Sequence, residues 1–209
     1  MVYQIQKINR PKIEKVYGKA MKELSSFFGI NWKYNLPPII LVPDRKVIDS
    51  LRGEKTEGWL VGWVDKNKIY MLDKKDFEKE SSHKYSEKEF SARIKHELAH
   101  CFSRIASDGV EIPTWLAEGI SIFLSNQNII WSRPKPKKFG IFIESYDAVK
   151  KGVYAEAGFA VEFLVKKYGK KKLFFLLKGL KKANTKQKFT KLFKSIYGFD
   201  LAYNNFKVL

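Results

Sequence analysis

The sequence predicts an α+β fold in which a small mixed sheet precedes a largely helical C-terminal part. Short apolar runs typical of strands occur at 39–42, 58–64 and 68–73. From Val153 onward, apolar residues recur at helical spacing instead. The 209 residues, 44% of them hydrophobic, are enough for one well-packed domain but not for two of full size. We therefore expect a single domain over 1–209, with the sheet in 1–125 and a helical part in 126–209.

The first predicted element is an amphipathic helix over Pro11–Phe28, which Gly29 ends. The apolar run at 39–42 follows Pro37 and Pro38 and predicts a central strand. A short helix from about Asp44 to Leu51 is expected next.

Two strand-like runs, Gly58–Val64 and Lys68–Asp73, are joined by turn residues at 65–67 and predict a β-hairpin. The charged stretch Lys74–Lys84 should be exposed, and it contains His83. A lone histidine in such a loop is expected to be solvated and is not assigned to a metal.

The most distinctive stretch is His96-Glu97-Leu98-Ala99-His100, an HExxH pattern. In a helix, the two imidazoles lie one turn apart on the same face, so that both can ligate one metal ion. Glu97 lies about 100° round the helix from His96, and its carboxylate can reach a water on that metal. Such a short pattern also arises by chance, so the surrounding sequence has to support it.

The surrounding sequence predicts a helix here. Ser86 to Glu89 form a capping-box pattern, so the helix should begin just before the motif. Apolar residues then recur on one stripe: Phe90, Ile94, Leu98, Cys101, Phe102 and Ile105. Polar side chains share a different face: Arg93, His96, Glu97, His100 and Arg104. Cys101 is the only cysteine, which excludes an internal disulfide, and its direction predicts a small buried core residue.

A zinc site of this kind needs a third protein ligand and leaves the fourth position to water. The metzincin type would have a histidine six residues after the second histidine, where this chain has Ala106, so that type is excluded. A second helical stretch follows from Pro113-Thr114 and carries a glutamate in the sequence Trp115-Leu116-Ala117-Glu118-Gly119.

At this point the sequence resembles the gluzincins, the thermolysin and alanyl-aminopeptidase superfamily, whose smaller members carry a peptidase-MA-like domain. In that group the third ligand is the glutamate of a W-L-x-E-G motif, which residues 115–119 match. The resemblance implies one Zn²⁺ held by His96, His100 and Glu118, with Glu97 as general base for a metal-activated water. It also implies a zincin-like fold, with an edge hairpin packed on the HExxH helix and a helical C-terminal part that closes the cleft.

By the same resemblance, the first hairpin strand is a sheet edge above the zinc. The backbone groups of Trp59, Leu60, Val61 and Gly62 would then pair with an extended peptide or protein substrate. A hairpin that only completes the sheet is the alternative. The aminopeptidases of the superfamily have a G-A-M-E-N motif in this strand, and residues 58–62 have no acid at the matching place. An aminopeptidase that recognises its substrate in that way is therefore disfavoured.

The helix predicted from Val153 resembles the one that closes the site in peptidase-MA-like domains, where a tyrosine near the helix start hydrogen-bonds the oxyanion. Tyr154 takes that place, with Tyr146 as the alternate and a packed core tyrosine as the structural alternative. Thermolysin-like enzymes also place an acid four residues after the ligand glutamate, to orient a ligand histidine. This chain has Ile122 there, so another group must make that contact.

The remaining helices are predicted over Lys170–Lys182, Thr185–Tyr197 and Asp200–Phe206, with Gly198 ending the second and Asp200 capping the third. Gly158 lies inside a predicted helix and indicates close packing against a neighbour. The basic stretch Trp131–Lys138 either edges the cleft or serves as a connector.

The formal net charge is +18, yet the lysines are spread over the chain without a recognised DNA- or RNA-binding motif. A solvated surface is the main interpretation, and affinity for a polyanion or an anionic membrane is the alternative. The N-terminus lacks the apolar run of a signal peptide and no stretch approaches a membrane span, so a cytoplasmic protein is expected.

The predicted function is zinc-dependent peptide-bond hydrolysis by an endopeptidase or oligopeptidase. Two alternatives are a non-catalytic gluzincin-fold binding protein and a protease recruited to nucleic acid by its basic surface. The sequence predicts no oligomeric state.

Overall fold

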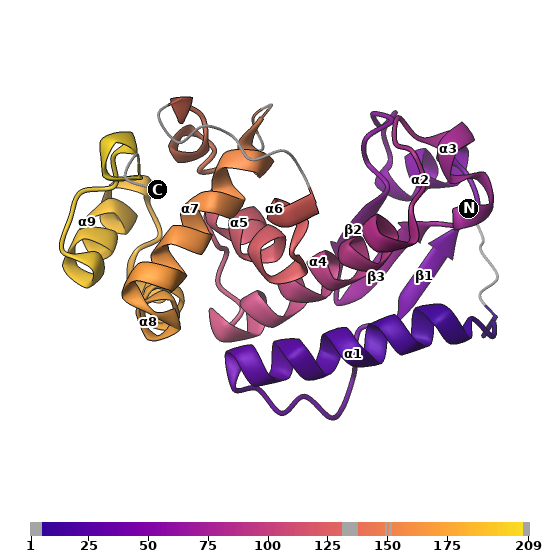
Figure 1. The fold of residues 1–209 in the computed structure, drawn as a ribbon, viewed down its shortest axis with the longest axis horizontal. Coiled ribbons are helices and arrows are strands. Elements are labelled where there is room, and N and C mark those ends of the chain that lie inside the picture. Colours follow the sequence, from indigo (N-terminus) through magenta and orange to yellow (C-terminus); the bar gives the residue numbers. More distant parts are fainter. Residues whose placement is uncertain (1–5, 131–137, 149, 151, 207–209) are drawn as a thin grey trace.

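The computed structural model of the chain describes residues 6–130, 138–148, 150 and 152–206. The chain is α-rich with a three-stranded sheet, which confirms the α+β class (Figure 1). The N-terminal helix and the sheet lie at one end of the long axis, and the C-terminal helices lie at the other (Figure 1). Among the described residues, none of the helices has the length and apolar content needed to cross a bilayer.

Helix α1 (Pro11–Phe28) confirms the first predicted element. Its buried side chains, Ala20, Met21, Leu24 and Phe28, form one apolar face that packs on α4 (Glu87–Ala106) (Figure 1). Gly29 ends the helix in the left-handed conformation, with φ 68°, and its N–H donates to the carbonyl of Ser25.

The sheet is mixed, with the strand order β1-β3-β2. Strand β1 (Ile39–Val42) runs parallel to β3 (Lys68–Leu72), and β2 (Gly62–Asp65) runs antiparallel to β3. The prediction that 39–42 forms the central strand is wrong, because the hairpin leaves one side of β3 open and β1 pairs there. The chain crosses over through α2 (Arg45–Arg52), which Asp44 caps by accepting from the Val47 N–H.

Strand β2 begins at Gly62, four residues later than the sequence predicts. The preceding segment is held in an irregular conformation by the Arg45 guanidinium, which donates to the carbonyls of Glu57, Gly58 and Leu60. Since these carbonyls are already bonded to Arg45, they do not need a ladder of strand hydrogen bonds.

Helix α4 carries the HExxH sequence and begins as predicted. The Ser86 hydroxyl accepts a hydrogen bond from the Glu89 N–H over 3.1 Å. The apolar stripe is buried, including Cys101 at 4% exposed, except that Ile105 is 39% exposed. The prediction for Ile105 is wrong because the last turn of α4 borders the cleft described below.

Helices α5 (Thr114–Ser125) and α7 (Val153–Tyr168) cross at two glycines, which confirms the close packing expected at Gly158. A Cβ on Gly119 would lie 2.5 Å from the carbonyl oxygen of Ala157, and one on Gly158 would overlap the Ile122 side chain. Only glycine allows this approach, which sets the start of α7 beside the middle of α5.

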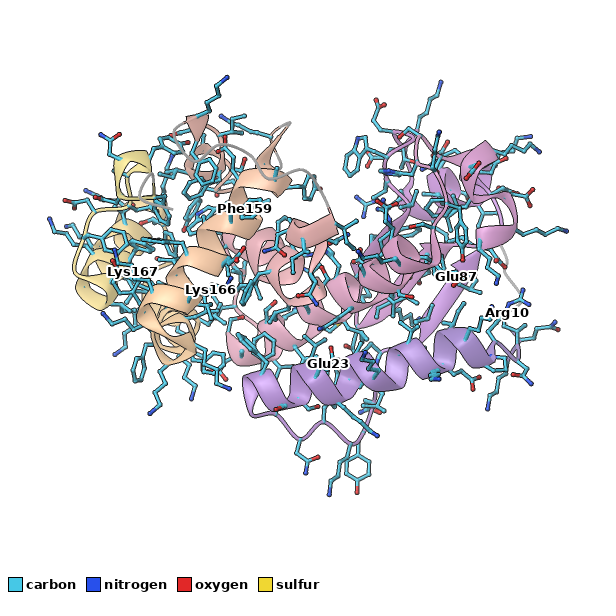
Figure 2. All side chains as sticks on the ribbon, in the orientation of Figure 1. Arg10, Glu23, Glu87, Phe159, Lys166 and Lys167 are labelled. Atoms are coloured by element: carbon cyan, nitrogen blue, oxygen red, sulfur yellow. The ribbon has the colours of Figure 1, made fainter. Side chains whose placement is uncertain are left out.

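The C-terminal part contains α8 (Lys170–Gly179) and α9 (Lys186–Tyr197), and Lys166 and Lys167 at the end of α7 lie beside them (Figure 2). The prediction of a helix over Asp200–Phe206 is wrong. Only a short 3-10 turn forms there, and the Asp200 carboxylate pairs with Lys194 instead of capping a helix. The other short elements are α3 (Phe77–Glu80), α6 (Gln127–Ile130) and the 3-10 turns Lys74–Asp76, Phe142–Glu144, Leu180–Lys182 and Tyr203–Phe206. Residues 131–137 of the basic stretch lie outside the described residues.

Candidate metal centre

The three predicted ligands converge from two neighbouring helices. The Nε2 atoms of His96 and His100, on α4, are 3.1 Å apart. Glu118, on α5, places Oε2 3.2 Å from His96 Nε2 and Oε1 3.6 Å from His100 Nε2. One ligand atom from each residue fits within 4.8 Å of the others.

These separations suit a tetrahedral zinc ion. Two ligand atoms about 2.0–2.1 Å from a common ion, at the tetrahedral angle, are about 3.3 Å apart. The separation of the two imidazole nitrogens, 3.1 Å, and that of His96 Nε2 from Glu118 Oε2, 3.2 Å, lie close to that value. His100 Nε2 is 3.6 Å from the other carboxylate oxygen, Oε1. Two imidazole nitrogens with one carboxylate, and no thiolate, are also a donor set that zinc accepts.

A hydrogen bond on the far side of His96 strengthens this fit. His96 Nδ1 lies 2.7 Å from Gln127 Oε1, an acceptor, so Nδ1 must carry the proton. In the neutral ring, Nε2 then presents a lone pair to Glu118 Oε2, a buried oxygen that has no hydrogen-bond donor among the described residues. His100 Nε2, 3.1 Å away, can donate to His96 Nε2, but this leaves Glu118 Oε2 without a donor. A cation held among the three atoms satisfies all of them.

The electrostatics of the three ligands point in the same direction. Burial raises the pKa of Glu118, but the two imidazoles outweigh burial and hold that pKa well below its usual range. Burial lowers the pKa of His100, yet the charge of Glu118 outweighs it and the pKa of His100 is raised. The cluster therefore favours positive charge at its centre, whether a proton or a metal ion supplies it.

Gln127 is a partner of His96 that the sequence analysis missed. Ile122, four residues after Glu118, is buried against Gly158 and cannot orient a histidine. The left-handed residue Asn126, with φ 63°, ends α5 and lets the chain return, so that Gln127 reaches His96 from α6. Ser125 Oγ lies 3.0 Å from the same amide oxygen and helps to hold it. In the sequence, Gln127 could have been noticed only because it and Asn128 are two polar residues directly after an apolar helix.

Replacing Gln127 by leucine should weaken zinc binding about 10- to 100-fold, because His96 loses the acceptor that fixes its ring and tautomer. Competition with a chromophoric chelator measures the affinity. Gln127→Glu is the matched control, since it keeps an acceptor at the same place and should bind zinc nearly as well as the wild type. A folded Gln127→Leu protein with wild-type affinity would contradict this role.

Glu97 lies beside the ligand cluster and against the hairpin. It is 8% exposed, and burial raises its pKa. A Cβ on Gly62 would lie only 3.3 Å from Glu97 Oε1, so the glycine lets the carboxylate approach the first residue of β2. The acid is therefore held between α4 and the sheet edge, next to the ligands but outside the set of three.

A cleft of about 1890 Å³ joins these groups. Its lining includes the three ligand residues, Glu97, Tyr154 and hairpin residues 59–64. The Tyr154 ring lies 6.3 Å from the Trp59 ring, and burial together with the charges of Glu118 and Glu97 raises the pKa of Tyr154. Tyr146, the alternate, instead packs on Phe189 at 5.6 Å and is absent from the lining.

The backbone at the cleft edge differs from the prediction for Trp59 to Gly62. The carbonyls of Trp59 and Leu60 accept hydrogen bonds from His83 Nε2 and Arg45, at 3.0 and 2.7 Å. Val61 accepts from the Leu72 N–H and so faces β3. Because an antiparallel strand alternates, the N–H and C=O groups of Gly62 and Val64 point away from β3. The edge available to a peptide is thus at 62 and 64.

His83 is not the solvated loop histidine that the sequence predicted. Its bond to Trp59 leaves the ring half-buried, and it lines the cleft. Burial lowers the pKa of His83, which favours the neutral ring. It does not join the candidate ligand group.

Comparisons of the chain with protein-family models, with curated proteins and with solved structures find no match. The functional assignment therefore depends on the chemistry of the site itself.

Proposed function

We propose that this chain is a zinc-dependent peptidase of the gluzincin type, acting as an endopeptidase or oligopeptidase. One observation carries the proposal: the cleft brings together three side chains that fit a zinc ion and the buried carboxylate of Glu97, which is not one of the three candidate ligands. A structural zinc site is normally closed by four protein ligands, whereas a catalytic site has three and an open position. The described residues offer three.

The bound ion would supply Lewis acidity, which lowers the pKa of water from about 15.7 towards 7 and stabilises negative charge on a carbonyl oxygen. Glu97 would take the proton of the attacking water and deliver it to the leaving amine. Burial raises the pKa of Glu97, and a raised pKa makes a carboxylate a better proton acceptor near neutral pH. A substrate strand would pair with the outward groups of Gly62 and Val64, close above Glu97.

Tyr154 would donate a hydrogen bond to the oxyanion that forms when the peptide carbonyl is attacked. Burial and nearby carboxylates raise its pKa, so the phenol keeps the proton that it must donate. Tyr154→Phe should lower kcat about 10²- to 10³-fold with a smaller change in KM. Steady-state kinetics on a fluorogenic peptide measure both. Tyr146→Phe is the matched control, and equal losses in the two variants would argue against a role for Tyr154 in catalysis.

The direct test combines metal analysis with hydrolysis of an unstructured protein such as casein. We expect one zinc per chain, loss of hydrolysis on chelation, and recovery when zinc is added back. Failure of the zinc-loaded protein to cleave casein or any member of a peptide library would overturn the proposal.

A further inference from the structure

We propose that Arg93 forms a carboxylate-binding subsite in the cleft, so that the peptidase selects substrates with an acidic group within one or two residues of the cleaved bond. This inference rests on the proposed function and names the substrate class for the same site. The carboxylate can belong to an aspartate or glutamate side chain, or to the C-terminus of the substrate.

Arg93 lies on α4, on the same face as His96 and Glu97. It precedes His96 by three residues and Glu97 by four on the same helix, spacings that place side chains on one face as neighbours. It lines the same cleft as the three ligands and Glu97. The Cβ atom of Arg93 is therefore about 5–6 Å, one helical turn, from the Cβ atoms of His96 and Glu97.

The Arg93 guanidinium has no hydrogen-bond or ion-pair partner among the described residues. Arg10 pairs with Asp73 and Arg52 with Glu54. The Arg45 guanidinium is bonded to backbone carbonyls. Arg93 has Glu89 and Glu97 as its charged neighbours, but neither approaches to hydrogen-bond or ion-pair distance in the part of the chain that the structure describes.

Partial burial favours a carboxylate as the partner of Arg93. Arg93 is half-buried, and burial lowers its pKa because the charged guanidinium has lost part of its solvation. A carboxylate can replace the remaining water through two parallel hydrogen bonds. The planar fork of arginine matches a carboxylate better than a lysine ammonium does.

The overall charge of the chain supports the same choice of ligand. A net charge of +18 attracts acidic peptides from solution and raises their concentration near the cleft. Within the cleft, Glu97 and Glu118 lie at the candidate metal site. Glu89 also lines the cleft but is not within ion-pair distance of Arg93, so the Arg93 charge is available to a ligand.

The experiment uses the zinc-loaded protein and a set of peptides with no other charged side chain. In these peptides one glutamate, or a glutamine in its place, is moved along the peptide sequence. Each peptide is prepared with a C-terminal amide and with a free carboxylate. Mass spectrometry locates the cut, and kinetics give kcat/KM. We expect cleavage at a constant distance from the glutamate, and about a 10- to 100-fold preference for glutamate over glutamine. Faster cleavage of the free-acid peptide than of its amide at bonds within one or two residues of the C-terminus, with glutamate and glutamine equal, would instead identify the terminal carboxylate as the ligand.

Variants then test whether Arg93 is the cause. Arg93→Met should reduce the Glu/Gln ratio to about one, and Arg93→Lys should leave an intermediate ratio because only the charge remains. Arg104→Met is the matched control, since this arginine lines the same cleft from the same helix but lies eleven residues further on. Its ratio should equal that of the wild type, and an unchanged ratio in Arg93→Met and Arg93→Lys would overturn the assignment.

The two proposals can fail separately. If the wild type cleaves glutamate and glutamine peptides at equal rates, and also free-acid and amide peptides at equal rates, the Arg93 subsite is wrong and the peptidase assignment stands. If it cleaves none of them, the peptidase assignment fails. Binding of the same peptides to zinc-loaded Glu97→Gln protein then tests the subsite without hydrolysis. A tenfold or greater affinity ratio of glutamate over glutamine, or of free acid over amide, supports the subsite, and equal affinities in both comparisons overturn it.

Discussion

Glu97→Gln is expected to lower kcat/KM for peptide hydrolysis by about 10²- to 10⁴-fold, the range attributed to general acid–base catalysis. Glutamine keeps the size of the side chain beside Gly62 but has no basic oxygen of comparable strength. The carboxylate lies outside the candidate ligand group, so zinc should stay bound at one ion per chain. Zinc content and kinetics measured on the same preparation separate loss of the base from loss of the metal.

The matched control for this change is Glu111→Gln, which removes an exposed acid from the same cleft. It should change kcat/KM little, because Glu111 is on the loop before α5 and away from the ligand group. Equal activity of wild-type and Glu97→Gln proteins would rule out Glu97 as the base. Absence of activity in both, with zinc bound, would favour the non-catalytic binding protein that the sequence also allowed.

Glu118→Gln should reduce zinc affinity by more than about 100-fold. That factor is the upper end of the loss seen when a residue hydrogen-bonded to a metal ligand is replaced, and this change removes a ligand itself. The imidazoles hold the pKa of Glu118 well below its usual range, so the native residue offers a charged oxygen at any pH used for the assay. A neutral amide oxygen is a poorer zinc ligand than that carboxylate. The site should then be too weak to retain zinc through dialysis, and hydrolysis should be lost with the metal.

Two measurements check this result: metal content after dialysis, and activity across a range of added zinc. Because the defect is in affinity, high zinc should restore part of the activity of Glu118→Gln but none of the activity of Glu97→Gln. Retention of zinc by Glu118→Gln at wild-type affinity would show that the side chain is not a ligand, and would remove the basis for the hydrolase proposal.

Local patterns in the sequence predicted the placement of the candidate ligands where one helix was enough. The spacing within residues 96–100 places both imidazoles on one face of α4, and the Ser86 cap sets where that helix begins. The W-L-x-E-G match predicted Glu118, and the structure brings it to 3.2 Å from His96. The spacing to Tyr154 was a weaker signal, yet the glycine crossing of α5 and α7 places Tyr154 in the same cleft.

The errors occurred where a partner distant in the sequence determines the local structure. Arg45 prevents a strand at Trp59 and Leu60 by bonding nearby carbonyls, and a pattern of apolar residues cannot show this. His83 is half-buried because its partner is the Trp59 carbonyl, 24 residues away. Residues 39–42 form an edge strand because strand order depends on pairing rather than on apolar content.

The sequence by itself therefore determined the α+β class, the start of the helix that carries the motif, and which side chains are candidates for holding a metal. These follow from periodicity and capping, which act over one or two turns of chain. Only the tertiary structure decided that Gln127 orients His96, that the open edge of β2 is at Gly62 and Val64, and that Arg93 faces the cleft without a partner. These depend on contacts between elements that are distant in the chain, where packing and hydrogen-bond satisfaction select the neighbours.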